Sequence, residues 1–253
     1  MNPLPPRVPP PNWAAIATRV RALPAFSDHN HHQPDSFFQT PLTLDRLITT
    51  SYAAWTGHAP ADASQRQAFW DKARFNSYFY WLEQGIRQTH GLETPLTLEN
   101  WETVSDRIAR RHAADPHFHV DVLRREGYER ILLDAYWRPG DDNGHPDLFT
   151  PAFRIDKFLY GTHAEAIAPN DYAVWREMQF TGGTLDDYVD RMRAWIRERH
   201  AAGAVAALKC AEAYFRSLDF HPDDPAAARR VFGGHPRDRS PEDLRLFGNF
   251  IFN

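Results

Sequence analysis

The segment Phe26–His32 reads FSDHNHH and comes directly after the Leu-Pro-Ala stretch at 23–25. Side chains two residues apart point to the same side of an extended backbone, so His29 and His31 can bind one metal ion. Imidazole is a common metal ligand, and such a pair supplies two of the three or four ligands that a catalytic site needs. Pro34 follows, which favours a first strand that runs into a loop. The alternative is a polar loop without a metal.

The composition is that of an ordinary globular protein, with 253 residues, 42% hydrophobic and 25% charged. A net charge of -4 argues against nucleic acid as a partner. No apolar run approaches the roughly 20 residues of a membrane helix, so no membrane partner is expected. The single cysteine, Cys210, excludes an intramolecular disulfide. Residues 1–11 are rich in proline and lack an apolar signal core, which predicts a flexible arm and a cytoplasmic protein.

The chain from about 42 to 118 has a helical pattern without strand signals. Leu44, Leu47 and Ile48, for example, keep the i, i+3, i+4 spacing of an amphipathic helix. We therefore predict a large helical insertion after the first strand. Its aromatic residues between 70 and 81 are expected to form packed core rather than a substrate cage.

Three further stretches resemble buried strands: 130–134, 149–158 and 204–209. Helices are expected after Thr184 and after Ser240, both of which are favourable N-cap residues. Strands that alternate with helices indicate a parallel sheet. Together with the HxH start, this order favours an α/β fold of the (β/α)8 TIM-barrel type over a doubly wound sheet.

The number of strands is too small for a complete barrel. Only four are found, and the residues outside the insertion fall short of the roughly 200–250 that a barrel needs. We therefore expect 12–253 to be the first half of a barrel that continues beyond Asn253. The stripe Leu244, Phe247 and Ile251 is expected to pack on a following strand. The alternative is a short protein that completes its sheet through a partner chain, as a homo-oligomer.

The His segment resembles the first-strand signature of the amidohydrolase superfamily, whose metal-dependent barrels open with an acidic residue and then HxH. Asp28 is adjacent to His29, whereas the family places this acid two residues earlier. Residues 208–218, LKCAEAYFRSL, are similar to the Lys, then Ala-Tyr-x-Arg-x-Leu pattern of amidohydrolase-2-type enzymes. That branch, which includes uronate isomerase, carries a large helical insertion after the first strand.

The resemblance implies a divalent metal, zinc first and manganese second, bound by His29 and His31. Lys209 would join them as a carboxylated ligand between two metals, or remain an ammonium that faces an anionic substrate. A structural, salt-bridged lysine is the alternative. The remaining metal ligands and the catalytic general base are expected beyond Asn253, so no catalytic residue is assigned here.

The substrate-binding candidates are Arg154, Tyr214 and Arg216, because a guanidinium matches the geometry of a carboxylate. A surface or ion-pair role is the alternative for each. His32 and Asp134 are weaker candidates, and the second HxH, at His117 and His119, is expected to be exposed.

The predicted function is that of a metal-dependent hydrolase acting on a small carboxylate-bearing or cyclic C–N or C–O substrate. A uronate-type isomerase and a related decarboxylase are alternatives that use the same metal-holding strand. An inactive fragment or a non-enzymatic binding protein is a further alternative, because two histidines alone bind zinc weakly.

Overall fold

The computed structural model describes residues 12–56, 59–221 and 224–253. Within these ranges the chain forms two compact units. We call them the helical unit, residues 12–25 and 33–129, and the sheet unit, residues 26–32 and 130–253. Each unit has its own hydrophobic core. The predicted flexible arm at 1–11 lies outside the described residues.

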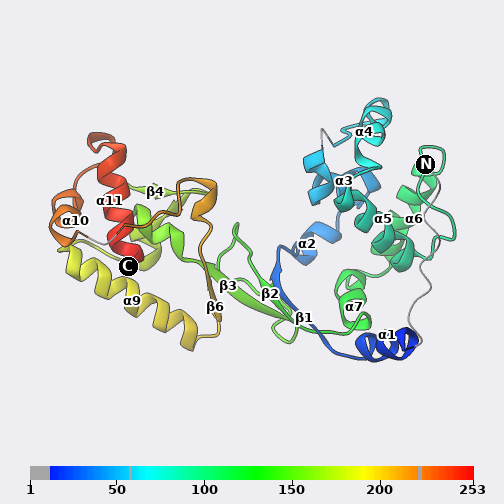
Figure 1. Ribbon diagram of the computed structural model, residues 1–253, viewed down its shortest axis with the longest axis horizontal. Helices are drawn as coiled ribbons and strands as arrows, with labels where there is room; N and C mark the ends of the chain where they lie inside the picture. Colours follow the sequence, from blue (N-terminus) through cyan, green and yellow to red (C-terminus); the bar gives the residue numbers. More distant parts are fainter. Residues whose placement is uncertain (1–11, 57–58, 222–223) are drawn as a thin grey trace. The chain divides into compact units, whose positions relative to one another are not determined.

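The helical unit consists of α-helices and short 3-10 helices. Its predicted helical character between 42 and 118 is confirmed, and side-chain caps explain several of the helix starts. The Thr43 and Asn76 side chains each accept a hydrogen bond from a backbone N–H of the first turn. The elements are α1 (Trp13–Arg21), α2 (Asp35–Phe38), α3 (Leu44–Thr49), η1 (Tyr52–Thr56), η2 (Ala63–Gln65), α4 (Arg66–Ala73), α5 (Ser77–His90), α6 (Trp101–Ala114) and α7 (Phe118–Arg125) (Figure 1).

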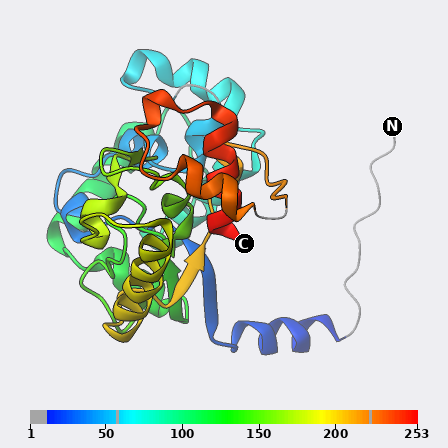
Figure 2. The ribbon, with the colours of Figure 1, turned by 90° about the vertical axis from the view of Figure 1, so that its left-hand side faces the viewer.

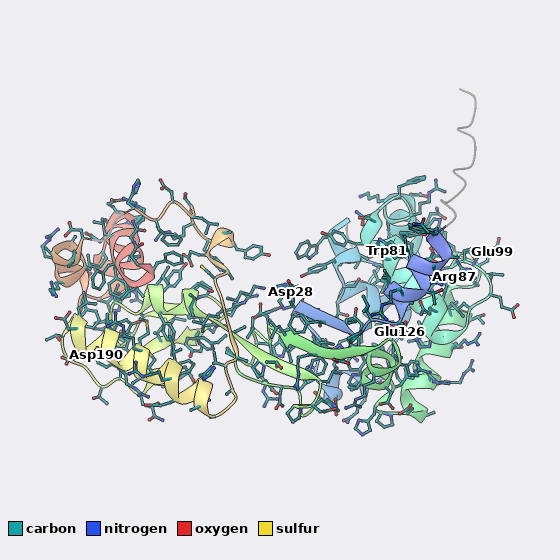
Figure 3. All side chains as sticks on the ribbon, turned by 60° about the horizontal axis from the view of Figure 1, so that its bottom comes forward. Asp28, Trp81, Arg87, Glu99, Glu126 and Asp190 are labelled. Atoms are coloured by element: carbon teal, nitrogen blue, oxygen red, sulfur yellow. The ribbon has the colours of Figure 1, made fainter. Side chains whose placement is uncertain are left out.

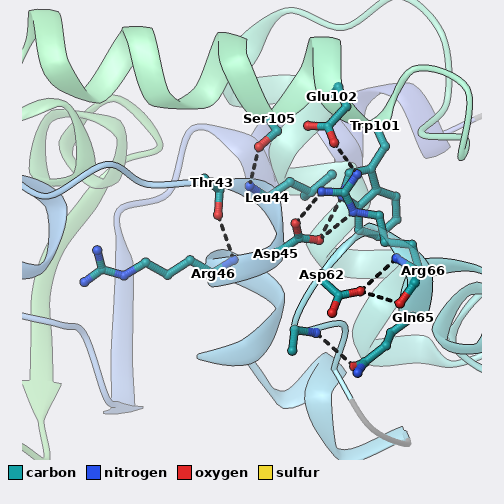
Figure 4. Close-up of polar contacts among 12 residues, drawn as sticks. Thr43, Leu44, Asp45, Arg46, Asp62, Gln65, Arg66, Trp101, Glu102 and Ser105 are labelled. Carbon is teal, nitrogen blue, oxygen red and sulfur yellow. Dashed lines mark hydrogen bonds and ion pairs between the residues drawn. The ribbon is translucent and has the colours of Figure 1, made fainter.

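A polar cluster centred on Asp45 joins three of these helices (Figure 4). The Asp45 carboxylate accepts hydrogen bonds from Arg66 Nε at 3.2 Å, Arg66 Nη2 at 2.6 Å and Trp101 Nε1 at 2.9 Å. Arg66 also donates to Glu102, and these hydrogen bonds raise the pKa of the Arg66 guanidinium. The cluster therefore fixes α3, α4 and α6 to one another beside the fully buried Trp101.

The prediction that the aromatic residues between 70 and 81 form core is wrong for most of them. Phe79 is buried, but Phe75 is 81% exposed and Trp81 is 69% exposed. Trp81 and Arg87 both project from α5 (Figure 3). A helix that carries aromatic residues on several faces can bury only the face that meets its neighbours.

Among the described residues of the helical unit, three histidines are buried: His90, His112 and His119. The prediction that His119 is exposed is wrong, because its ring stacks on Phe38 with the centroids 3.9 Å apart. The ring centroids of His90 and His112 lie 5.9 Å apart, and both rings also contact the ring of Phe118. Burial, the neighbouring His112 and nearby arginines lower the pKa of His90 from 6.5 to about 4.

Acid is therefore expected to destabilise the helical unit through His90. The folded state holds this ring neutral down to about pH 4, whereas the unfolded chain protonates it below about pH 6.5. The contribution of His90 to the free energy of unfolding is therefore fully present above about pH 6.5 and is lost as the pH falls. Between pH 7 and 4.5 the loss should be about 2 kcal/mol. Urea unfolding at both pH values checks this. His90→Gln should show a smaller loss, whereas the exposed-site control His200→Gln should not, and equal losses in all three proteins would contradict the assignment.

The sheet unit contains the strands. The sheet order is β1 (Ala25–Asn30), β2 (Tyr128–Leu133), β3 (Phe149–Arg154) and β6 (Ala207–Lys209), and β4 (Ile167–Ala168) pairs separately with β5 (Tyr172–Ala173). β2 with β3 and β3 with β6 are parallel. β1 runs the same way as β2, because Ala25 N–H donates to Gly127 and Asp134 N–H to Asn30. The helices are η3 (Ile155–Tyr160), α8 (Val174–Met178), α9 (Leu185–Ala201), η4 (Glu212–Tyr214), α10 (Pro225–Val231), η5 (Pro236–Asp238) and α11 (Pro241–Phe252).

The prediction of a TIM-barrel type fold is wrong. The described residues form a mixed α/β fold with an open sheet of four parallel strands and a separate antiparallel pair. The prediction failed because alternating strands and helices are common to every parallel α/β sheet and do not by themselves require a closed barrel. Moreover, β4 and β5, which lie between β3 and β6 in the sequence, pair antiparallel with each other. Successive strands of the chain therefore do not all belong to one sheet.

The core of the sheet unit is built around the turn that follows η3. Tyr188 is fully buried, and its hydroxyl donates to the Phe158 carbonyl oxygen at 2.8 Å. Trp175 Nε1 donates to the Gly161 carbonyl oxygen at 2.8 Å. α11 packs on α10 and η3 (Figure 2), and Phe247 is fully buried there against Tyr188. Phe247, the central residue of the predicted apolar stripe, is thus buried within the sheet unit. The strand that was expected after Asn253 stays a prediction.

Two capping boxes begin the longer helices of this unit. Thr184 and Asp187 cap α9, and Ser240 and Asp243 cap α11, each through reciprocal side-chain to backbone hydrogen bonds. Both helix starts were predicted and are confirmed. None of the helices in the described part of the chain has the length and apolar character needed to cross a bilayer.

Candidate functional site at the carboxyl edge of the sheet

An ionisable residue lies at or next to the carboxyl end of each of the four parallel strands. His29 lies near the end of β1 and His31 just beyond it, Asp134 follows β2, Arg154 ends β3 and Lys209 ends β6. The carboxyl ends of parallel strands meet at one edge of a sheet, which is where open α/β folds bind ligands. Because of their positions at the strand ends, these five side chains lie at one edge of the sheet.

Asp134 is the centre of this cluster and is only 2% exposed. Its carboxylate accepts hydrogen bonds from Arg154 Nε at 3.0 Å and Arg154 Nη2 at 2.9 Å, and Lys209 Nζ lies 2.8 Å from Oδ2. Burial alone would raise the pKa of Asp134, but the hydrogen bonds from Arg154 and Lys209 outweigh it and lower the pKa. Asp134 therefore stays ionised although it is buried.

His31 is oriented by the backbone of Asp134. Its Nδ1 lies 2.8 Å from the Asp134 carbonyl oxygen. A carbonyl can only accept, so Nδ1 carries the hydrogen and Nε2 keeps its lone pair in the neutral ring. Histidines that bind metals commonly donate their other ring N–H to a carbonyl or carboxylate in this way.

His29 and Lys209 face each other across the sheet edge. Lys209 Nζ lies 3.0 Å from His29 Nδ1 and 3.2 Å from Nε2, and the rings of His29 and His31 are 4.7 Å apart. Burial, Lys209 and His31 lower the pKa of His29, so the ring is neutral near pH 7. The Lys209 ammonium is thus a cation held between an imidazole and the Asp134 carboxylate.

These residues are of the types that bind a divalent metal ion, although their ligand atoms do not all lie within 4.8 Å of one another in the structure. Two neutral imidazoles and one carboxylate are a ligand set found in catalytic zinc sites, which leave a fourth position for water or substrate. The tautomer of His31 is already the one that a metal requires, and Asp134 is ionised. Asp28 is not part of this set, because successive side chains of a strand point to opposite faces and Asp28 directly precedes His29 in β1.

The three predicted carboxylate-binding residues lie in different surroundings. Arg154 belongs to the cluster, where its guanidinium is bound to Asp134 and its Cζ lies 4.8 Å from the centre of the Tyr136 ring. Tyr214 is 73% exposed, on η4. Arg216 donates to Asn249 Oδ1 and to the Arg245 carbonyl oxygen, both on α11. The structure thus brings only Arg154 together with His29, His31 and Lys209.

Sequence reasoning gave too little weight to Asp134, which contacts residues from three other strands. The available signal was its position, since an acid directly after an apolar parallel strand lies at the carboxyl edge of the sheet. At the similarity required of a match, no protein-family model, curated protein or solved structure matches this chain.

Proposed function

We propose that the chain is a metal-dependent hydrolase of the kind found in the amidohydrolase superfamily, with zinc as the first candidate metal and manganese as the second. The observation that carries this proposal is the position of the Lys209 ammonium, 3.0 Å from His29 and 2.8 Å from Asp134. Neutral nitrogen and ionised oxygen donors that already hold a monovalent cation attract a divalent one more strongly, because the Coulomb energy scales with charge.

The proposed ligands are His29, His31 and Asp134. A metal bound there would acidify a water molecule and polarise a substrate carbonyl. Arg154 keeps Asp134 ionised, and the Asp134 carbonyl oxygen keeps His31 in the required tautomer. Lys209 would leave its present position and either offer its ammonium to a substrate carboxylate or, once carboxylated, act as a ligand.

The proposed substrates follow from the same charges. A hydrolysable C–N or C–O bond placed beside the metal and a carboxylate placed on the Lys209 ammonium would fit a small carboxylate-bearing or cyclic compound. The expectations of a cytoplasmic location and of a homo-oligomer stay predictions from the sequence.

Zinc is expected to bind with one-to-one stoichiometry and to depend on both imidazoles. After dialysis against zinc, elemental analysis should find about one ion per chain. His29→Ala and His31→Ala should each weaken binding roughly 50-fold in calorimetric titrations, about 2.3 kcal/mol. His200→Ala, an exposed histidine on α9, is the matched control. Zinc affinity that is unchanged in both site variants would refute the proposed ligands.

The reaction class is tested with the zinc- and manganese-loaded chain. Assays against panels of amides, lactones and esters that carry a carboxylate should show hydrolysis that is lost in His31→Ala. Turnover of uronates alone would replace the hydrolase by an isomerase. One-to-one metal binding without any turnover would favour a non-enzymatic binding protein.

A further inference from the structure

A second candidate ligand site lies in the sheet unit between η3, the segment after β6 and α11. It is a pocket of about 400 Å³. This volume lies in the range of roughly 300–1,000 Å³ that small-molecule sites occupy. Most of its wall is apolar, with Leu159, Ile167, Phe215 and Leu244 among the lining residues. It shares no residue with the His29–Asp134–Lys209 cluster.

The wall of this pocket contains one buried carboxyl group whose hydrogen bonding is incomplete. Glu212 is 1% exposed, and its Oε1 accepts a hydrogen bond from the Tyr160 hydroxyl at 2.7 Å. Its Oε2 has no hydrogen-bond partner among the described residues. Burial raises the pKa of Glu212. A buried acceptor without a partner costs about 1–3 kcal/mol, so a ligand that donates to it gains that amount.

The two arginines in the wall are already bound to acceptors of the protein. Arg216 donates to Asn249 Oδ1 at 2.5 Å and to the Arg245 carbonyl oxygen at 3.3 Å. Arg245 binds Glu242 through two hydrogen bonds, at 2.8 and 2.5 Å. Neither guanidinium is therefore arranged to receive an anion, and the group that lacks a partner is an acceptor.

From this arrangement we infer that the pocket binds a small, mainly apolar molecule with a single hydroxyl or primary amine, which donates a hydrogen bond to Glu212 Oε2. The apolar body would lie against Leu159, Phe215 and Leu244. The chemistry excludes carboxylates, because a ligand carboxylate would face the Glu212 carboxylate.

The inference is tested with four probes of one shape: benzyl alcohol, benzylamine, toluene and phenylacetate. Binding to the full chain is followed by shifts in the methyl resonances of Ile167 and Leu244. We expect benzyl alcohol or benzylamine to bind at least tenfold more tightly than toluene and phenylacetate. A preference for the amine identifies a charged ligand, and a preference for the alcohol a neutral one.

Two variants locate the effect. Glu212→Leu should remove the tenfold preference while toluene still binds, and Leu244→Trp should block all four probes by filling the pocket. Glu212→Gln keeps the shape of the side chain, so it tests the charge if the leucine variant does not fold. The inference is overturned if toluene or phenylacetate binds as well as the two donors, if no probe binds at about 10 mM, or if the preference survives in both Glu212 variants.

Discussion

Replacement of Asp134 by leucine is expected to lower the free energy of unfolding of the sheet unit by about 3–5 kcal/mol. The replacement leaves the guanidinium of Arg154 buried without a carboxylate. Arg154 is only 9% exposed, and Asp134 accepts the hydrogen bonds from its Nε and Nη2. A buried guanidinium without its carboxylate keeps the full cost of leaving water, because nothing compensates it. Urea unfolding at pH 7, followed by tryptophan fluorescence, measures the loss.

Two controls separate the buried charge from other effects. The double variant Asp134→Leu with Arg154→Met removes both charges and should recover most of the lost stability. Glu242→Ala breaks the exposed pair with Arg245 and should leave the unfolding midpoint nearly unchanged. A double variant as unstable as Asp134→Leu alone would show that the cost does not come from the unpaired Arg154.

Gly161→Ala is expected to destabilise the sheet unit by about 3 kcal/mol. A Cβ atom at this position would lie 2.6 Å from Cζ of Tyr188 and closer still to its hydroxyl oxygen. Tyr188 is fully buried and cannot move aside without losing its hydrogen bond to the Phe158 carbonyl oxygen. Crowding and the lost hydrogen bond therefore act together. The change in the urea unfolding midpoint measures their sum.

The matched glycine is Gly85, which lies within α5 and has no atom near its missing Cβ. Gly85→Ala should stabilise the helical unit by about 0.5–1 kcal/mol, because alanine favours a helix. Tyr188→Phe removes only the hydroxyl and so separates the hydrogen bond from the crowding. If Gly161→Ala is as stable as the parent chain, the turn after η3 can relax and the close approach to Tyr188 is not required.

The local elements of this fold could be predicted from the sequence, because their signals lie within a few residues. Thr184 and Ser240 begin helices through side-chain caps, and the apolar run at 130–134 gives β2. The predicted limits of the strands were less accurate than those of the helices. β6 covers only Ala207–Lys209 where six residues were predicted, and β3 ends at Arg154, where the chain turns into η3. Alanine-rich and aromatic runs fit strand, helix and loop about equally, so tertiary packing decides their limits.

The closure of the sheet and the surroundings of each site residue could not be predicted in the same way. Whether parallel strands close into a barrel depends on how they pair, and the alternation of elements is the same in either case. The sequence placed His29, His31 and Lys209 at strand ends, but the three cationic or imidazole partners of Asp134 come from residues 20 to 103 positions away. Such pairings depend on the fold, since no local pattern encodes them.

The connection between β1 and β2 also determines when the cluster can form during synthesis. His31 and its acceptor at Asp134 are 103 residues apart, and His29 and Lys209 are 180 residues apart. At ribosomal rates of roughly 5–20 residues per second, Asp134 is made about 5–20 s after His31, and Lys209 about 9–36 s after His29. During that interval the two imidazoles exist without the carboxylate and without the ammonium. At the proposed metal site, a cation that reached the nascent chain early would therefore meet only two nitrogen ligands, and tight binding would have to wait until β2 has been added to β1.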